Sequence, residues 1–134
     1  MATIQHEFEV PAAAEEVWAA LRDFGALHDK LATGFVTACT LEEEGAVRLI
    51  TFANGMQVRE RLVTLDDAAM RIVYSATGGR TTHHNASAQV IPLGPRRCRF
   101  VWTTDLLPDA MAPAIGQMMA TGAKAMQARL TPAR

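Results

Sequence analysis

Glu60 is the residue of this sequence whose surroundings most directly suggest chemistry. It lies in the stretch VRLITFANGMQVRERLV, in which two apolar runs flank the pair Asn54-Gly55. Asn-Gly is the preferred two-residue type I′ hairpin turn, because both residues accept a positive φ at low cost. A turn at this pair predicts that Leu49 lies opposite Glu60 and that both point inward. A carboxylate in the protein interior is costly unless it is paired, hydrogen-bonded, protonated or hydrated.

The predicted register of this hairpin divides its side chains between an inner and an outer face. Successive side chains of a strand point to opposite faces of the sheet. The inner face is predicted to carry Val47, Leu49, Thr51, Val58, Glu60 and Leu62. The outer face is predicted to carry the arginines Arg48, Arg59 and Arg61. Glu60 would then be the charged group on a mostly apolar inner face.

Strand alternation supplies further candidates for an interior site. The predicted inner faces carry His6, Tyr74, His84, Ala86, Ala88, Phe100 and Trp102. The small side chains of Ala86 and Ala88 leave space beside a large apolar surface, which a cavity requires. His6 can also lie at a sheet edge, because it belongs to the first predicted strand.

Glu60 and an inward histidine, His84 or His6, could form a general acid/base pair. Burial raises the pKa of a carboxyl group, and histidine titrates near neutral pH. Such a pair suits proton abstraction beside a ketone or the loss of water, which are steps of an aldol-type cyclisation. In the alternative interpretation, Glu60 forms a salt bridge with an arginine at the rim of a cavity. The histidines would then be hydrogen-bonded residues of the core or rim.

The sequence predicts neither a metal site nor another cofactor. His83 and His84 are adjacent in a predicted strand, so their rings point to opposite faces and cannot easily share one ion. Cys39 and Cys98 are too far apart for a CxxC site and are expected to be buried thiols. Sequence patterns for phosphate-binding loops, dinucleotide sites, zinc proteases and serine hydrolases are absent.

Composition narrows the class of ligand. The 134 residues fit a single domain, residues 1–134, and contain 13 basic and 14 acidic side chains. This balance gives no electrostatic footprint for nucleic acid, and the cluster Arg96, Arg97 and Arg99 is expected to be a solvated surface.

No apolar run approaches about 20 residues, and the N-terminal stretch lacks a signal-peptide pattern. We expect neither membrane insertion nor export, and therefore a cytoplasmic location.

Apolar periodicity predicts an α+β order of elements. Alternation predicts a strand at residues 3–10, and helical spacing predicts a short helix in AAAEEVWAALRDF, with one or two further turns after it. Residues 35–106 are predicted to be mostly antiparallel strands. The stretch PDAMAPAIGQMMATGAKAMQARL is predicted to form a long C-terminal helix. Its apolar face carries Ile115, Met118, Met119, Gly122, Ala125 and Met126, which line a cavity or simply pack in the core.

Two stretches carry a resemblance to a known family. They are VPAAAEEVWAALRDFGAL and GAVRLITFANGMQVRERLVTLDDAAMRIVYS, which contain Gly45, Arg48, Gly55, Glu60, Leu62, Asp66 and Tyr74; Pro92 and Trp102 fit as well. With them the chain resembles the START/Bet v1-like (SRPBCC) superfamily over nearly its whole length, specifically the polyketide cyclase/dehydrase and lipid-transport branch. One departure is His84, near which the family often has an aromatic residue.

The resemblance implies a helix-grip fold, a curved antiparallel sheet of about six or seven strands around the C-terminal helix, with an apolar cavity between them. It also implies a small hydrophobic or aromatic ligand, and members include cyclases, carriers and proteins of no known activity. In an enzyme, Glu60, His84 and Tyr74 would be catalytic. The ligand would contact Trp102, Phe100, Leu49, Ala86, Ala88, Met118, Met119 and Gly122. The alternatives are a non-catalytic carrier or sensor of a lipid or other hydrophobic metabolite, and a protein-interaction module; either a monomer or a homodimer is expected.

Overall fold

Seven antiparallel strands form one sheet in the order β1-β7-β6-β5-β4-β3-β2. The computed structural model describes residues 1–133. The strands are β1 (Ala2–Val10), β2 (Val36–Glu42), β3 (Val47–Phe52), β4 (Gln57–Asp66), β5 (Arg71–Thr77), β6 (His83–Gly94) and β7 (Arg97–Leu107). The helices are α1 (Ala14–Arg22) and α2 (Ala112–Leu130), with short helical turns η1 (Phe24–Ala26), η2 (Leu27–Leu31), η3 (Glu43–Gly45) and η4 (Asp109–Met111).

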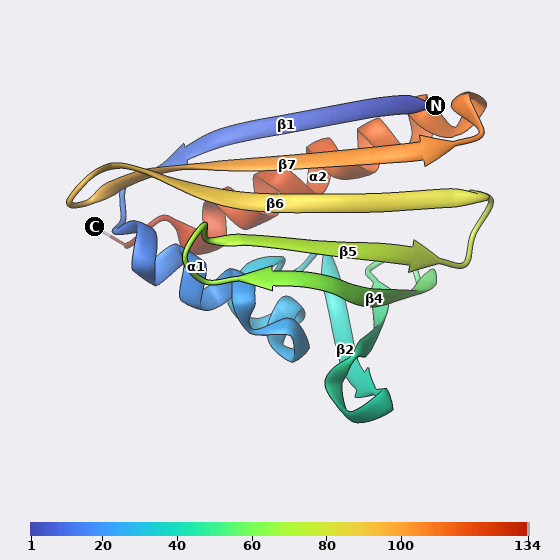
Figure 1. Cartoon of the computed structure of the whole chain (residues 1–134), viewed down its shortest axis with the longest axis horizontal. Coiled ribbons are helices and arrows are strands. Elements are labelled where there is room, and N and C mark those ends of the chain that lie inside the picture. Colours follow the sequence, from blue (N-terminus) through green and yellow to red (C-terminus); the bar gives the residue numbers. More distant parts are fainter. Residues whose placement is uncertain (134) are drawn as a thin grey trace.

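Helix α2 lies along one face of the sheet, as Figure 1 shows, and contacts β1. Its buried residues are Met119, Gly122, Ala123 and Met126. Helix α1 packs against β6, and the turn η2 packs against α2, so the same face is covered from both ends of the chain. The predicted α+β arrangement of a sheet around a long C-terminal helix is confirmed. No helix within residues 1–133 has the length and apolar composition needed to cross a membrane.

The strand predicted at residues 3–10 is confirmed as β1. Its even-numbered side chains are half-buried or buried and its odd-numbered ones from Thr3 to Glu9 are exposed, which is the alternation that the sequence predicts. Phe8 stacks on Phe100 of β7, with ring centroids 4.9 Å apart. These contacts tie the edge strand β1 to the core.

The predicted register of β3 and β4 is wrong by one residue. Glu60 pairs with Arg48, not Leu49, and Val58 pairs with Ile50. Because side chains alternate with a period of two, a slip of one residue moves every side chain of β3 to the other face. Arg48 is therefore buried rather than on the outer face, and Leu49 is turned away from the site.

The cause of this shift is the turn between the two strands. The loop has three residues, 53–55, closed by a hydrogen bond that the Phe52 N–H donates to the Met56 carbonyl at 2.8 Å. Gly55 has φ of +89°, whereas Asn54 keeps a negative φ and so does not form a type I′ turn. The Asn54 side chain instead accepts a hydrogen bond from the Met56 N–H at 3.0 Å. This is the three-residue hairpin with glycine in the left-handed region.

Arg59 and Arg61 lie on the outer face, as predicted. Arg59 binds Glu42 at 2.8 Å, and Arg61 binds Glu43 at 2.9 Å. Three of the four side chains are more than half exposed and the Glu42 side chain is 32% exposed, so these ion pairs contribute little to stability.

Candidate functional site

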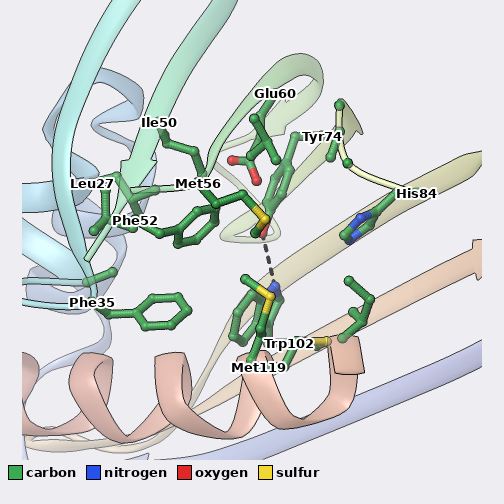
Figure 2. A pocket seen from close by; sticks show the side chains of 18 of the residues that line it. Leu27, Phe35, Ile50, Phe52, Met56, Glu60, Tyr74, His84, Trp102 and Met119 are labelled. Atoms are coloured by element: carbon green, nitrogen blue, oxygen red, sulfur yellow. Dashed lines mark hydrogen bonds between the residues drawn. The ribbon is translucent and has the colours of Figure 1, made fainter. Parts of the chain in front are cut away.

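A cavity of about 420 Å³ lies between the inner face of the sheet and helix α2. Figure 2 shows its wall, which is built mainly from apolar side chains of the strands, α2 and the segment 27–36. Among the labelled residues, Leu27, Phe35, Ile50, Phe52, Met56, Trp102 and Met119 form this apolar part. A cavity of this size and composition is typical of small-molecule sites.

The cavity reaches the protein surface at one end. Its lining there includes Met56 directly after the β3–β4 loop, residues 78–81 from the β5–β6 loop, and Met111, Ala114 and Ile115 near the start of α2. Met56 is 36% exposed, and residues 78–80 are exposed. These three segments therefore frame the opening through which a ligand would enter.

The polar part of the wall is organised by a buried ion pair. Arg48 Nη2 lies 2.7 Å from Glu60 Oε1 in an ion pair, and Arg48 Nε donates a hydrogen bond to the same oxygen at 2.8 Å. The two side chains are only 5% and 10% exposed. The register of β3 and β4 causes this pairing, because it places the two residues directly opposite each other.

The position of Arg48 is fixed by further contacts. Its Nη1 donates a hydrogen bond to the Phe24 carbonyl at 3.3 Å, and its guanidinium lies 4.1 Å from the centroid of the Phe24 ring. The guanidinium also lies 5.0 Å from the centroid of the Tyr74 ring. Aromatic faces attract cations, most strongly where water is excluded. Arg48 therefore joins the segment after α1 to β4 and β5.

Tyr74 is the second polar group of the wall. Its hydroxyl oxygen accepts a hydrogen bond from Trp102 Nε1 at 3.0 Å, across the cavity wall from β7 to β5 (Figure 2). Burial raises the pKa of Tyr74 well above its usual value, and the negative charge of Glu60 adds to this effect. The charge of Arg48 and the hydrogen bond from Trp102 oppose it. The side chain is therefore a neutral phenol at physiological pH.

His84 lines the cavity from β6 and is half-buried. Burial lowers its pKa, although the charge of Glu60 acts in the opposite direction. The neutral imidazole is thus the main form at neutral pH. Within the described residues no hydrogen bond joins His84 to Glu60, so the two groups predicted as an acid/base pair line the same cavity without a direct hydrogen bond.

Five of the eight residues predicted to contact a ligand line the cavity: Ala88, Phe100, Trp102, Met118 and Met119. Ala86 is buried on the same face but does not reach the cavity. Gly122 shapes the wall indirectly, because an added Cβ would lie 3.1 Å from Phe35 and 3.3 Å from Trp102. Leu49 does not line the cavity, since the shifted register turns it outward.

The main residue that the sequence reasoning missed is Arg48. The signal was present: a register shifted by one residue places an arginine opposite the buried carboxylate. The ion pair foreseen in the alternative interpretation therefore forms, but with an arginine of the neighbouring strand. His6, the other histidine considered, is half-buried on β1 and pairs with Trp102 in the sheet without lining the cavity.

Comparison with known proteins gives a family match over almost the whole chain. Residues 1–131 match the family model described as polyketide cyclase / dehydrase and lipid transport. No match was found among curated protein sequences.

Solved structures with the same fold include proteins from several bacteria. An uncharacterized protein of Bacillus thuringiensis has 23% identity and a TM-score of 0.86, covering 96% of this chain and 98% of its own. A Thermobifida fusca protein has 31% identity and a TM-score of 0.77, with 97% and 93% covered. The Zhui aromatase/cyclase of Streptomyces has 19% identity and a TM-score of 0.79, with 96% and 90% covered. The predicted helix-grip fold of the START/Bet v1 type is thus confirmed.

We expect replacement of Glu60 by leucine to destabilise the protein by about 3 kcal/mol, because it leaves the Arg48 charge buried without a partner. The double variant Arg48→Met/Glu60→Leu should recover most of this loss, since no unpaired charge remains. Urea unfolding of the single and double variants measures both effects. Glu42→Leu, which breaks the more exposed pair with Arg59, is the matched control and should cost less than about 1 kcal/mol. Equal losses for Glu60→Leu and Glu42→Leu would contradict the role of burial.

Tyr74 is the single tyrosine of the sequence, so tyrosinate absorbance reports on it alone. Because burial raises its pKa, the folded protein should show no tyrosinate signal as the pH passes about 10, the usual value. The raised pKa stabilises the fold below about pH 10, and this contribution is lost as the pH rises further. Absorbance and circular dichroism recorded together should show ionisation only with unfolding. Ionisation near pH 10 with the fold intact would show that the phenol is hydrated.

Proposed function

The chain belongs to the polyketide cyclase / dehydrase and lipid transport family, and we propose that it binds a small, mostly apolar or aromatic molecule in its internal cavity. The observation that carries this proposal is the cavity of about 420 Å³, whose wall is apolar except for a few convergent polar groups. Such a wall provides affinity through its apolar surface and orientation through its polar groups. The Streptomyces structure of the same fold is that of an aromatase/cyclase, which agrees with an aromatic or polyketide-like ligand.

In the enzymatic form of this proposal, three side chains act on a ligand that carries a carbonyl group. The neutral imidazole of His84 takes a proton from the carbon next to the carbonyl, and Tyr74 donates a hydrogen bond to the oxygen on which negative charge develops. The charge of Glu60 stabilises the imidazolium that forms. The imidazolium then returns the proton to a departing hydroxyl, so that water leaves and a double bond remains.

A non-catalytic carrier is the second candidate. Two observations support it: Glu60 forms an ion pair with Arg48, and no hydrogen bond joins His84 to Glu60 within residues 1–133. In a carrier these groups only orient the ligand. A protein-interaction role for the outer arginines has less support, because Arg59 and Arg61 are already paired with glutamates.

Filling the cavity should abolish ligand binding. Ala88 lies in the cavity wall and is 2% exposed, so the three added carbons of Ala88→Leu occupy ligand space. Titration with the neutral fluorophore N-phenyl-1-naphthylamine should show that Ala88→Leu binds it at least about tenfold more weakly than the unchanged protein does. Thermal unfolding should first show that the variant is folded. Ala38→Leu on the exposed part of β2 is the matched control and should bind normally. Equal affinities for all three proteins would contradict the proposed site.

The enzyme and the carrier differ in what co-purifies with a His84 variant. If His84 is the base for loss of water, native mass spectrometry of His84→Asn should find a bound molecule heavier by one water than that bound by the unchanged protein. A carrier should hold the same molecule in both proteins. His6→Asn is the control, because His6 does not line the cavity. An unchanged mass in His84→Asn would rule out the dehydration step.

A further inference from the structure

We infer that the ligand of this cavity is a neutral hydroxy-carbonyl compound, with a carbonyl oxygen that binds Tyr74 and a hydroxyl group that binds Glu60, both on an apolar or aromatic body. This inference rests on the proposed function, since it names the chemistry that the cavity selects. It follows from the hydrogen-bonding capacity of Tyr74 and Glu60 that no other side chain of the described residues uses.

The Tyr74 hydroxyl is left as a hydrogen-bond donor. The indole N–H of Trp102 can only donate, so the hydrogen bond of 3.0 Å between them uses a lone pair of the Tyr74 oxygen. Within residues 1–133 no group accepts the proton of the Tyr74 hydroxyl. Because burial raises its pKa, the phenol keeps that proton. An apolar ligand would leave this buried donor unsatisfied, whereas a carbonyl oxygen would accept its hydrogen bond.

Glu60 is left as a hydrogen-bond acceptor. Both close contacts from Arg48 are made to Oε1, by the Nε hydrogen bond at 2.8 Å and by Nη2 at 2.7 Å, and within the described residues no hydrogen bond is donated to Oε2. A carboxylate oxygen accepts more than one hydrogen bond, and hydroxyl groups are good donors to it. The second oxygen therefore favours a ligand that carries a hydroxyl group.

The two unused groups lie close enough to bind one small molecule. Tyr74 pairs with Leu62 and Glu60 pairs with Ala76, so the two residues are diagonal neighbours on the same face of β4 and β5. Side chains in that relation have Cα atoms roughly 7–8 Å apart. A single fused aromatic ring system with both functional groups can span such a separation.

The charges in the cavity favour a neutral ligand. Arg48 and Glu60 cancel each other, and burial keeps His84 mainly uncharged at neutral pH. Arg80, in the exposed β5–β6 loop, is the other charged residue of the lining and lies at the opening. A carboxylate ligand placed at Tyr74 would lose its hydration in a site that has no net positive charge to compensate it, so a fatty acid is not the expected occupant.

A set of matched naphthalenes tests this inference by displacement of N-phenyl-1-naphthylamine. The set contains 2-ethylnaphthalene, 2-naphthol, 2-acetylnaphthalene, and acetyl-2-naphthol with the acetyl group at position 6 or 7 to vary the spacing. Each functional group should improve affinity by up to about tenfold, because it satisfies one buried polar atom. At least one acetylnaphthol should therefore bind most tightly. Decanoate should bind more weakly than decanol, because the cavity interior has no net charge.

The variant Tyr74→Phe assigns the carbonyl contribution. It should remove the affinity advantage of 2-acetylnaphthalene over 2-ethylnaphthalene. The affinity advantage of 2-naphthol over 2-ethylnaphthalene should remain unchanged, so each comparison is the control for the other. Equal binding of all the naphthalenes, or preference for decanoate over decanol, would overturn the ligand chemistry and leave the proposed binding site standing. If neither the naphthalenes nor the fluorophore binds, the proposed function itself fails.

Discussion

Arg48 and Glu60 place opposite charges inside a wall that is otherwise apolar, and each depends on the other for compensation. A hydrogen bond and an ion-pair contact to one carboxylate oxygen hold the pair, and the Phe24 carbonyl and ring hold the arginine from the other side. The pair therefore links the segment after α1 to strands β3, β4 and β5. The contacts from Arg48 are made to Oε1 of Glu60, so Oε2 can still accept a hydrogen bond. The ion pair therefore both stabilises the wall and orients an acceptor toward the cavity.

The cavity exists because the sheet and α2 cannot close on each other at this point. The rings of Phe35 and Trp102 approach the helix at Gly122, where any side chain would meet them. On the sheet, Ala88 leaves room beside Phe100 and Trp102. Small residues thus decide where the space lies, and aromatic rings and methionines decide its walls. A dense core elsewhere supports this opening, since Val10, Cys98 and Leu106 are fully buried.

The polar side chains of the cavity differ in their protonation and hydrogen-bonding roles. Burial keeps His84 a neutral base and Tyr74 a neutral donor, while the arginine keeps the charge of Glu60 compensated. A site of this kind recognises a ligand by hydrogen bonds rather than by charge. The proposed enzyme and the proposed carrier would use the same cavity wall and would differ in whether His84 transfers a proton.

Local patterns in the sequence determined most of the fold. Strict alternation identified β1, helical spacing identified α1 and α2, and both Glu60 and Tyr74 were correctly assigned to the inner face. The partner of Glu60 required the tertiary structure, because Asn54-Gly55 is compatible with hairpin loops of two or three residues. The two loops differ by one residue in register, and that residue decides whether Leu49 or Arg48 faces the cavity. The longer loop brings Arg48 inside, where it pairs with Glu60 and contacts Phe24, and a local pattern does not contain these long-range contacts.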